Sequence, residues 1–190
     1  MQRICVFCGS SSGASPEYQA AATRLGHLLA ERRIALVYGG SNVGLMGALA
    51  DAVLAAGGHA IGVIPRSLVD REVAHRGLTD LRIVDSMHER KALMADLADG
   101  FIAMPGGYGT FDELCEILTW AQLGIHARPV GLLNTLGYWN PFLQFLDHSV
   151  AAGFLKPAHR AFLEVCDTPP GLLDRLLRNQ PQPVVSVRIR

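Results

Sequence analysis

Short apolar runs alternate along the chain with stretches in which apolar residues recur every three or four positions. The runs predict buried strands, because parallel strands covered on both faces are almost continuously hydrophobic. The stretches between them predict helices that each bury one stripe. The alternation therefore predicts one α/β domain over residues 1–180 on a mostly parallel sheet, with residues 181–190 as a C-terminal extension. Strands are expected at 4–7, 34–38, 60–64, 81–84, 101–104 and 130–133, and helices at 16–32, 45–56, 88–98, 111–123, 138–152 and 171–178.

A glycine-rich turn joins the strand near residue 102 to the helix that follows it. Its sequence is Met104-Pro-Gly-Gly-Tyr-Gly-Thr-Phe-Asp-Glu113. Glycines there let backbone N–H groups approach a ligand, and a helix N-terminus adds unpaired N–H donors and partial positive charge. The spacing matches neither the dinucleotide fingerprint nor the P-loop. The turn nevertheless favours an anion site, most simply for a phosphate.

Thr110 and Glu113 in this turn have a structural and a functional interpretation. Thr-x-x-Glu before an apolar run is a capping box, which satisfies the first N–H groups of a helix. For Thr110 that role and a substrate-binding role are both open. Glu113 shares a helical face with Ile117 and Trp120, whereas Asp112 points to the wetter side. A carboxylate beside a phosphate loop is a candidate for catalysis.

Two other strand ends are rich in glycine and serine, at 8–13 and 38–47. Ligands of parallel α/β sheets bind outside the carboxyl ends of the strands. Each segment alone could be an ordinary turn, but three at one sheet edge favour a ligand with several polar parts, such as a nucleotide.

The segment Ser86-Met-His-Glu-Arg-Lys91 supplies a cation. Ser86 and Glu89 form a capping box, so Glu89 is assigned a structural role. Arg90 lies on the inward apolar stripe in the first helical turn, where its charge opposes the helix dipole. A bound anion or a partner carboxylate should compensate, and a buried ion pair with Glu113 is the structural alternative. Lys91 points off the stripe and is expected to be solvated.

Composition excludes several classes of function. The 190 residues are 49% hydrophobic and 18% charged with a formal net charge of zero. The sequence therefore predicts no basic patch for binding nucleic acid or a membrane surface. Cys5 and Cys8 fall within one strand and face opposite sides, which favours core thiols over a redox or zinc pair. The seven histidines show no metal-binding spacing, so no metal is expected. The chain begins with a strand-like run, so the cytoplasm is the expected compartment.

Several longer motifs complete the pattern, and together they resemble one family. They are Phe7-Cys-Gly-Ser-Ser11, Leu36-Val-Tyr-Gly-Gly40, Gly44-Leu-Met-Gly47, Met87-His-x-Arg-Lys91, Pro105-Gly-Gly-Tyr-Gly-Thr-x-x-Glu113 and Thr119-Trp-Ala-Gln-Leu-Gly-Ile-His126. The chain resembles the LOG (Lonely Guy) family of cytokinin-activating phosphoribohydrolases over nearly its whole length. The resemblance implies a Rossmann-like three-layer α/β sandwich and a homodimer without a cofactor. It also implies hydrolysis of AMP or an N6-substituted AMP, such as N6-isopentenyl-AMP, to the free base and ribose 5-phosphate.

The resemblance also implies roles for single residues. Arg90 and Glu113 are expected to be catalytic. The expected substrate-binding residues are Glu72, Lys91, Gly107, Tyr108, Gly109, Thr110 and Thr119, together with Met87, Gly106, Ser10 and Gly40 from the same motifs and strand ends.

Two positions sit awkwardly with the family pattern. Ser41 stands where many members have a third glycine, and helical spacing turns Thr119 away from Glu113. Thr119 would reach a site only if its helix were buried on both sides, as at a dimer contact. Relatives often carry a lysine decarboxylase label, but pyridoxal phosphate needs a Schiff-base lysine. The chain has only Lys91 and Lys156, neither in a recognisable setting for one.

The expected chemistry passes through an oxocarbenium-like sugar, which a carboxylate stabilises directly or by taking a proton from water. Glu113 is the predicted carboxylate, and Arg90 either orients it or binds phosphate and ribose oxygens. No second carboxylate is placed as an acid for the departing base. The competing hypothesis is a nucleotide-binding module that uses the glycine loops without catalysis.

Overall fold

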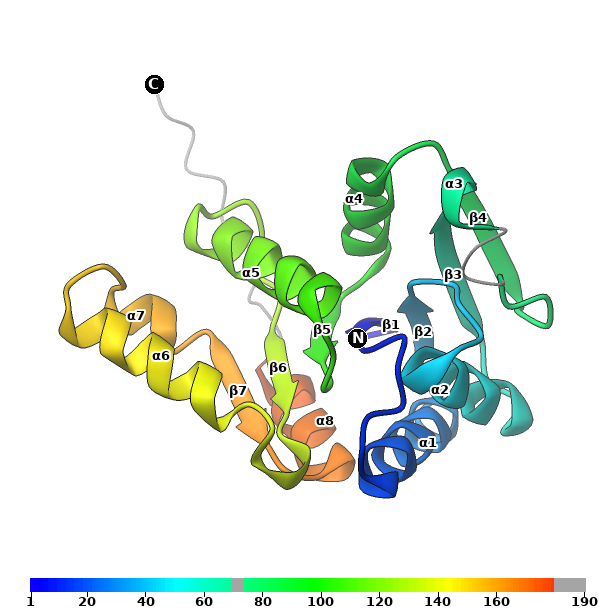
Figure 1. Cartoon of the computed structure of the whole chain (residues 1–190), viewed down its shortest axis with the longest axis horizontal. Coiled ribbons are helices and arrows are strands. Elements are labelled where there is room, and N and C mark those ends of the chain that lie inside the picture. The colour runs from blue at the N-terminus through cyan, green and yellow to red at the C-terminus, as the bar shows by residue number, and fades with distance from the viewer. Residues whose placement is uncertain (70–73, 180–190) are drawn as a thin grey trace.

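The computed structural model describes residues 1–69 and 74–179. Their strands form one seven-stranded sheet in the order β4-β3-β2-β1-β5-β6-β7, and every pairing within it is parallel. Helices cover both faces of the sheet (Figure 1). The predicted Rossmann-like three-layer sandwich is therefore confirmed. The predicted extension at 181–190 lies outside the described residues, and the domain boundary stays a prediction.

All the predicted strands and helices appear in the predicted order, and the described residues add one strand and three short helices that the sequence did not predict. The strands are β1 (Arg3–Phe7), β2 (Ala35–Tyr38), β3 (Ala60–Pro65), β4 (Asp80–Val84), β5 (Gly100–Ala103), β6 (Val130–Leu133) and β7 (Leu163–Cys166). The helices are α1 (Pro16–Glu31), α2 (Gly44–Ala55), α3 (Arg66–Val69), α4 (Met87–Leu97), α5 (Tyr108–Gln122), η1 (Thr135–Gly137), α6 (Asn140–Ala151), α7 (Pro157–Arg160) and α8 (Pro169–Arg178).

The two faces of the sheet bury separate apolar clusters. Helices α1, α2 and α8 cover one face, and α4 and α5 cover the other together with Trp139 and the inner side of α6. Cys8 belongs to the first cluster and Cys5 to the second, so the predicted opposite orientation of these thiols is confirmed, although Cys8 lies one residue after the end of β1. Among the described residues, no group of three or more His, Cys, Asp or Glu side chains could hold a metal ion.

The chain reverses its direction across the sheet between β1 and β5. From β1 the strand order runs outward through β2, β3 and β4, whereas β5, β6 and β7 lie on the other side. A crevice forms above the carboxyl ends of the strands at such a switch point, and ligands of open α/β sheets bind there. The loops that follow β1 and β5 are the glycine-rich segments singled out in the sequence.

Helix α5 starts earlier than predicted. Gly107 is its N-cap and its carbonyl accepts the Phe111 N–H at 3.1 Å, while no side chain caps the helix. The capping-box interpretation of Thr110 and Glu113 is therefore wrong, because both residues already lie inside the helix. The N-terminal N–H groups of α5 keep no side-chain partner and remain suited to an anion.

The cap of α4 agrees with the sequence, and α1 also begins with a serine cap. Ser15 Oγ accepts the Glu17 N–H at 3.4 Å, and Ser86 Oγ accepts the Glu89 N–H at 3.1 Å. The Glu89 carboxylate accepts a backbone N–H at 2.9 Å, but from Asp85, one residue before the cap. Glu89 therefore has the structural role that the sequence predicts.

Candidate active site

Three glycine-rich loops meet at the switch point and are joined by backbone hydrogen bonds. The Gly9 N–H donates to the Pro105 carbonyl at 3.0 Å, and the Leu45 N–H donates to the Gly9 carbonyl at 3.1 Å. At Gly44, where φ is +59°, an added Cβ would lie 2.3 Å from the Ser10 carbonyl carbon. The backbones are thus packed too closely for side chains, which explains the glycines at this edge.

Two adjoining cavities open where the loops meet. The first, of about 190 Å³, is lined by Val6, Cys8, Gly9, Ser10, Gly39, Met46, Arg90, Gly107, Tyr108, Gly109, Thr110 and Glu113. The second, of about 340 Å³, is lined by Gly9, Ser10, Ser11, Ser12, Gly13, Tyr18, Leu45, Pro105, Gly106, Gly107 and Tyr138. They share Gly9, Ser10 and Gly107, so the loops form a common wall. Together they reach the size of ordinary small-molecule sites, about 300–1,000 Å³.

Arg90 is held in the first cavity by two backbone carbonyls, one within β3 and one just after β2. Its Nε donates to the Val63 carbonyl at 3.0 Å and its Nη2 to the Gly39 carbonyl at 3.2 Å, and only 7% of the residue is exposed. The predicted inward orientation of Arg90 is therefore confirmed. Backbone carbonyls offset part of the cost of burying the cation.

Glu113 faces the same cavity from α5. Its Oε1 lies 3.9 Å from Arg90 Nη1, and its side chain is 11% exposed. The distance exceeds that of a hydrogen bond, so the two groups attract each other without a tight contact. Burial and then the negative charge of Glu113 raise the pKa of the nearby Cys8 thiol. Cys8 therefore lines the cavity as a neutral thiol rather than as a nucleophile.

Lys91 is not solvated, and that prediction was wrong. Its Nζ lies 3.0 Å from Asp112 Oδ2 and 3.1 Å from Glu116 Oε1, with the side chain 11% exposed. Burial acts to lower the pKa of Lys91, but the hydrogen bonds and charges of the two carboxylates outweigh it and raise the pKa. Lys91 is therefore a charged link from α4 to α5, beside but outside the cavity lining.

The other predicted substrate-binding residues fall into two groups. Ser10, Gly106, Gly107, Tyr108, Gly109 and Thr110 line one or both cavities. Met87, Thr119 and Gly40 do not: Met87 Sδ lies 3.9 Å from Arg90 Nη1, Thr119 is exposed on the outer side of α5, and Gly40 is buried with φ of +77°. Glu72 lies outside the described residues. Gly39 and Met46 line the first cavity; they were not named as site residues, although they belong to the segment 38–47 that the sequence singled out. Tyr138 lines the second cavity and was not predicted, since only the folded chain brings it there.

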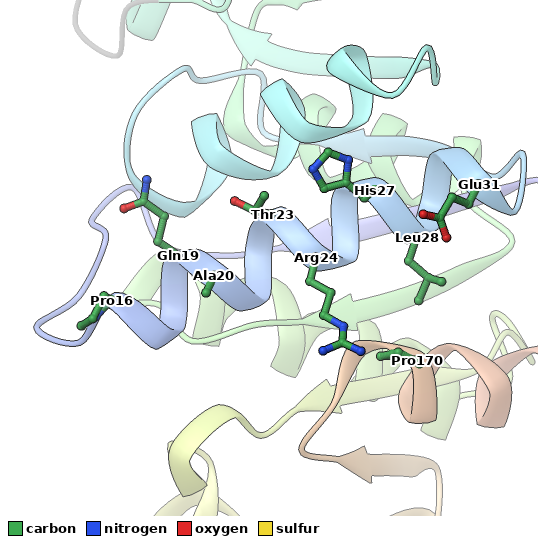
Figure 2. Close-up of a pocket in the computed structure, with 9 residues that line it drawn as sticks. All are labelled: Pro16, Gln19, Ala20, Thr23, Arg24, His27, Leu28, Glu31 and Pro170. Carbon is green, nitrogen blue, oxygen red and sulfur yellow. The ribbon is translucent and has the colours of Figure 1, made fainter.

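Larger grooves lie elsewhere on the surface but lack this chemistry. One of about 830 Å³ runs along α1 and is lined by Pro16, Gln19, Ala20, Thr23, Arg24, His27, Leu28, Glu31 and Pro170 (Figure 2). Apart from Pro170 of α8, these side chains stand on the outer side of α1, and the lining contains no glycine. The glycine-lined cavities are therefore the better candidate for the site.

Comparison with known proteins identifies relatives of the chain. The family model described as "Possible lysine decarboxylase" matches residues 46–176. Cytokinin riboside 5'-monophosphate phosphoribohydrolase LOG7 of Arabidopsis thaliana is 52% identical over 95% of this chain and 83% of its own length. The corresponding LOG enzyme of Oryza sativa subsp. japonica is 55% identical over 85% of this chain and 67% of its own length.

Solved structures of more distant proteins share the fold. The molybdenum cofactor carrier protein of Chlamydomonas reinhardtii superimposes with a TM-score of 0.70 at 20% identity, over 93% of this chain and 96% of that one. The molybdenum cofactor binding protein of Rippkaea orientalis gives 0.69 at 22% identity, over 93% and 94%. At this identity the likeness concerns the architecture only. The level of identity to the plant enzymes, over nearly the whole chain, shows that this protein belongs to the LOG family of cytokinin riboside 5'-monophosphate phosphoribohydrolases.

Proposed function

We propose that this protein hydrolyses the N-glycosidic bond of adenosine 5′-monophosphates, including N6-substituted ones, and releases the base and ribose 5-phosphate. The single observation that carries the proposal is the meeting of Glu113 and Arg90, 3.9 Å apart, in a cavity whose wall is the glycine loop at the start of α5. An anion-binding helix end and a carboxylate one turn further on are the two features that the reaction needs.

The phosphate of the substrate binds at the N-terminus of α5 in this proposal. The first-turn N–H groups have no acceptor within the helix, and the helix dipole favours negative charge there. The buried Thr110 side chain packs directly against Gly106, because a Cβ added to Gly106 would lie only 2.1 Å from Thr110 Oγ1. Binding energy from the phosphate thereby fixes the sugar without acting on the bond that breaks.

Glu113 acts on the sugar. As the glycosidic bond lengthens, positive charge develops at the anomeric carbon, and the carboxylate stabilises that charge or accepts a proton from the attacking water. Arg90 orients Glu113: its Nε and Nη2 are engaged by strand carbonyls, which leaves Nη1 facing the carboxylate and the cavity.

Lysine decarboxylation by a pyridoxal Schiff base does not suit the chain. Lys91 is bound by two carboxylates, and Lys156 is exposed at the start of α7. Neither lysine lines the two cavities at the switch point. These cavities therefore offer no lysine that could form a Schiff base with the aldehyde group of pyridoxal phosphate.

The test incubates the protein with AMP or N6-isopentenyl-AMP and measures the released base by chromatography. Glu113→Gln and Arg90→Ala should each lower the rate roughly 10²–10³-fold, the effect of removing one group that stabilises a transition state. Asp96→Asn, which neutralises an exposed carboxylate on α4, is the matched control and should keep the parent rate. Binding of AMP without release of adenine by the parent would instead identify a nucleotide-binding module.

The proposal includes a homodimer formed through α5 and α6. Helices α5 and α6 lie next to each other on one side of the molecule (Figure 1). Leu123 at the end of α5, Phe145 on α6 and Phe154 after α6 are exposed large apolar side chains, at 66%, 61% and 90%. No residue of α6 is fully buried within the chain, although the helix carries Phe142, Leu143 and Leu146. Exposed apolar side chains of this kind support the proposal of an interface here. Pairing there would also cover Thr119 and give it a route to a substrate site.

Light scattering after size exclusion tests the dimer. The parent should have twice the chain mass of 20.5 kDa, and Phe145→Asp combined with Leu123→Asp should run as a monomer. A monomeric parent at micromolar concentration would contradict the dimer.

All four cysteines are free thiols, which agrees with a reducing compartment, and we place the protein in the cytoplasm. No helix of the described residues has the length and apolar character to cross a bilayer.

A further inference from the structure

Tyr138 contacts the glycine loop from the side away from Arg90 and Glu113. It follows β6 in sequence, and its hydroxyl donates a hydrogen bond to the carbonyl oxygen of Gly106, 32 residues earlier in the chain. Tyr138 lines only the second cavity, whereas Gly107 lines both. The loop wall between the two cavities is thus held on one side by a tyrosine.

The bonded carbonyl belongs to the peptide unit that joins Gly106 to Gly107. This unit is planar and trans, so its C=O and its N–H point in opposite directions. Because the carbonyl is turned toward Tyr138, the Gly107 N–H points away from Tyr138, and Gly107 also lines the first cavity. That N–H stands at the N-cap of α5, next to the unpaired N–H groups of the first helical turn.

The Gly106–Gly107 unit needs such a brace, because glycine backbones are less restricted than others and rotate about φ and ψ at little cost. A side chain at Gly106 would be 2.8 Å from the Gly9 nitrogen as well as against Thr110, so bulk cannot replace glycine there. A hydrogen bond from outside the loop, such as that of Tyr138, restricts the rotation of this peptide.

Tyr138 is itself fixed by a turn of unusual conformation. Leu136 and Gly137 both adopt positive φ, at +54° and +70°. Such a conformation for leucine persists only when its surroundings enforce it. Here the Asn134 side chain accepts the Trp139 N–H at 2.8 Å and donates to Asn140 Oδ1 at 2.9 Å, which clamps the turn.

Aromatic packing holds the Tyr138 ring. The ring meets Trp139 edge to face at 5.2 Å and Tyr18 of α1 at 6.1 Å. Trp139 is fully buried and serves as the anchor of the turn. The hydroxyl therefore reaches Gly106 from a rigid support rather than from a mobile side chain.

We propose that Tyr138 is a positioning residue, which orients the Gly106–Gly107 peptide so that the Gly107 N–H is presented to the 5′-phosphate of the substrate. The inference rests on the proposed function in one respect only, that the anion at this helix end is the phosphate of a nucleotide. Tyr138 acts through the peptide and does not touch the reacting atoms.

The test compares ligands with and without a phosphate. Calorimetry would measure the affinities of AMP, ribose 5-phosphate and adenosine for the Glu113→Gln protein, which turns over too slowly to interfere. Adding Tyr138→Phe removes one hydroxyl and keeps the ring. AMP and ribose 5-phosphate should then bind roughly five- to tenfold more weakly, the effect of one hydrogen bond, while adenosine binds as before. In the enzyme with Glu113 intact, the same change should raise KM more than it lowers kcat.

Tyr38→Phe is the matched control, since it also removes one tyrosine hydroxyl, and Tyr38 is buried outside the lining of both cavities. It should leave all three affinities unchanged. Unchanged affinity for AMP in the Tyr138→Phe protein, or an equal loss for adenosine, would overturn the proposal. A parent that binds AMP but releases no adenine refutes the hydrolase and leaves this inference standing. A parent that releases adenine, with Tyr138→Phe binding AMP normally, refutes this inference and leaves the hydrolase.

Discussion

A methyl group at Gly39 should expel Arg90 from its place beside Glu113. A Cβ built on Gly39 would lie 2.0 Å from Arg90 Nη2 and 3.0 Å from Met46 Sδ. Non-bonded carbon and nitrogen prefer a separation of about 3.5 Å, so the guanidinium would have to retreat by about 1.5 Å. Its hydrogen bonds to the Val63 and Gly39 carbonyls, at 3.0 and 3.2 Å, would not survive that displacement.

The expected magnitude follows from what Arg90 loses. A displacement of about 1 Å in a positioning group can reduce catalysis about 10²-fold, so kcat/KM of Gly39→Ala should fall roughly that far. Each hydrogen bond to a charged group contributes about 1.5–3 kcal/mol, and part of this returns when the freed guanidinium reaches water. A loss of about 2 kcal/mol should lower Tm by roughly 4–8 °C for a chain of this size.

A double-mutant cycle separates this mechanism from a general disturbance of the loop. Truncation of Arg90 to alanine removes the group with which the new methyl collides. Gly39→Ala added to Arg90→Ala should therefore have little further effect on Tm, whereas independent defects would add. The measurements are thermal melts and base release from AMP. Wild-type kcat/KM in Gly39→Ala, or additive losses of Tm in the double variant, would refute the steric argument.

Three further outcomes follow from the structure. Burial acts to raise the pKa of Asp99, but hydrogen bonds from backbone N–H groups near the N-terminus outweigh it and lower the pKa. The ionised carboxylate therefore stabilises the fold above its usual pKa of about 4, and this stabilisation is lost as the pH falls. Asp99→Ala should therefore melt a few degrees lower at pH 7, with a gap that closes in acid; a constant gap would contradict this. Burial raises the pKa of both Cys5 and Cys8, so Ellman's reagent should modify them only after unfolding, and rapid labelling of either in the native protein would refute it. Lys91→Met should lower Tm and kcat/KM. If Lys91 acts only as a link between α4 and α5, neutralising both of its carboxylate partners should reproduce these losses. A loss seen only in Lys91→Met would instead indicate that Lys91 contacts the substrate.

The order of elements follows from sequence, because hydrophobic period is a local property. The run Leu163–Cys166 was missed as a strand, since at the sheet edge only its first residue is fully buried and the run has no continuous apolar signature. The start of α5 was placed three residues late, because Thr110 and Glu113 imitate a capping box. The direction of Glu113 was nevertheless correct, since helical periodicity does not depend on where the helix begins.

The site was harder to predict where it depends on neighbours distant in sequence. Lys91 was expected to be solvated because nothing near it in the chain shows that α5 brings Asp112 and Glu116 against it. Tyr138 has no local signal at all, since its partner Gly106 lies in a different loop. Residues whose chemistry is local, such as the glycines of the turn, are predictable from sequence. Residues that act across elements need the folded chain.

The position of Arg90 depends both on the local sequence and on contacts that only the folded chain makes. In sequence it is disfavoured twice, as a cation on an apolar stripe and in the first turn of a helix. In the fold, Gly39 just after β2 and Val63 within β3 lie beside it and supply carbonyl oxygens to the guanidinium. On the other side of the same cavity, α5 begins and presents N–H groups. One edge of a parallel sheet therefore offers acceptors for a cation beside donors for an anion, and a sequence can place opposite charges there that neither helix would stabilise alone.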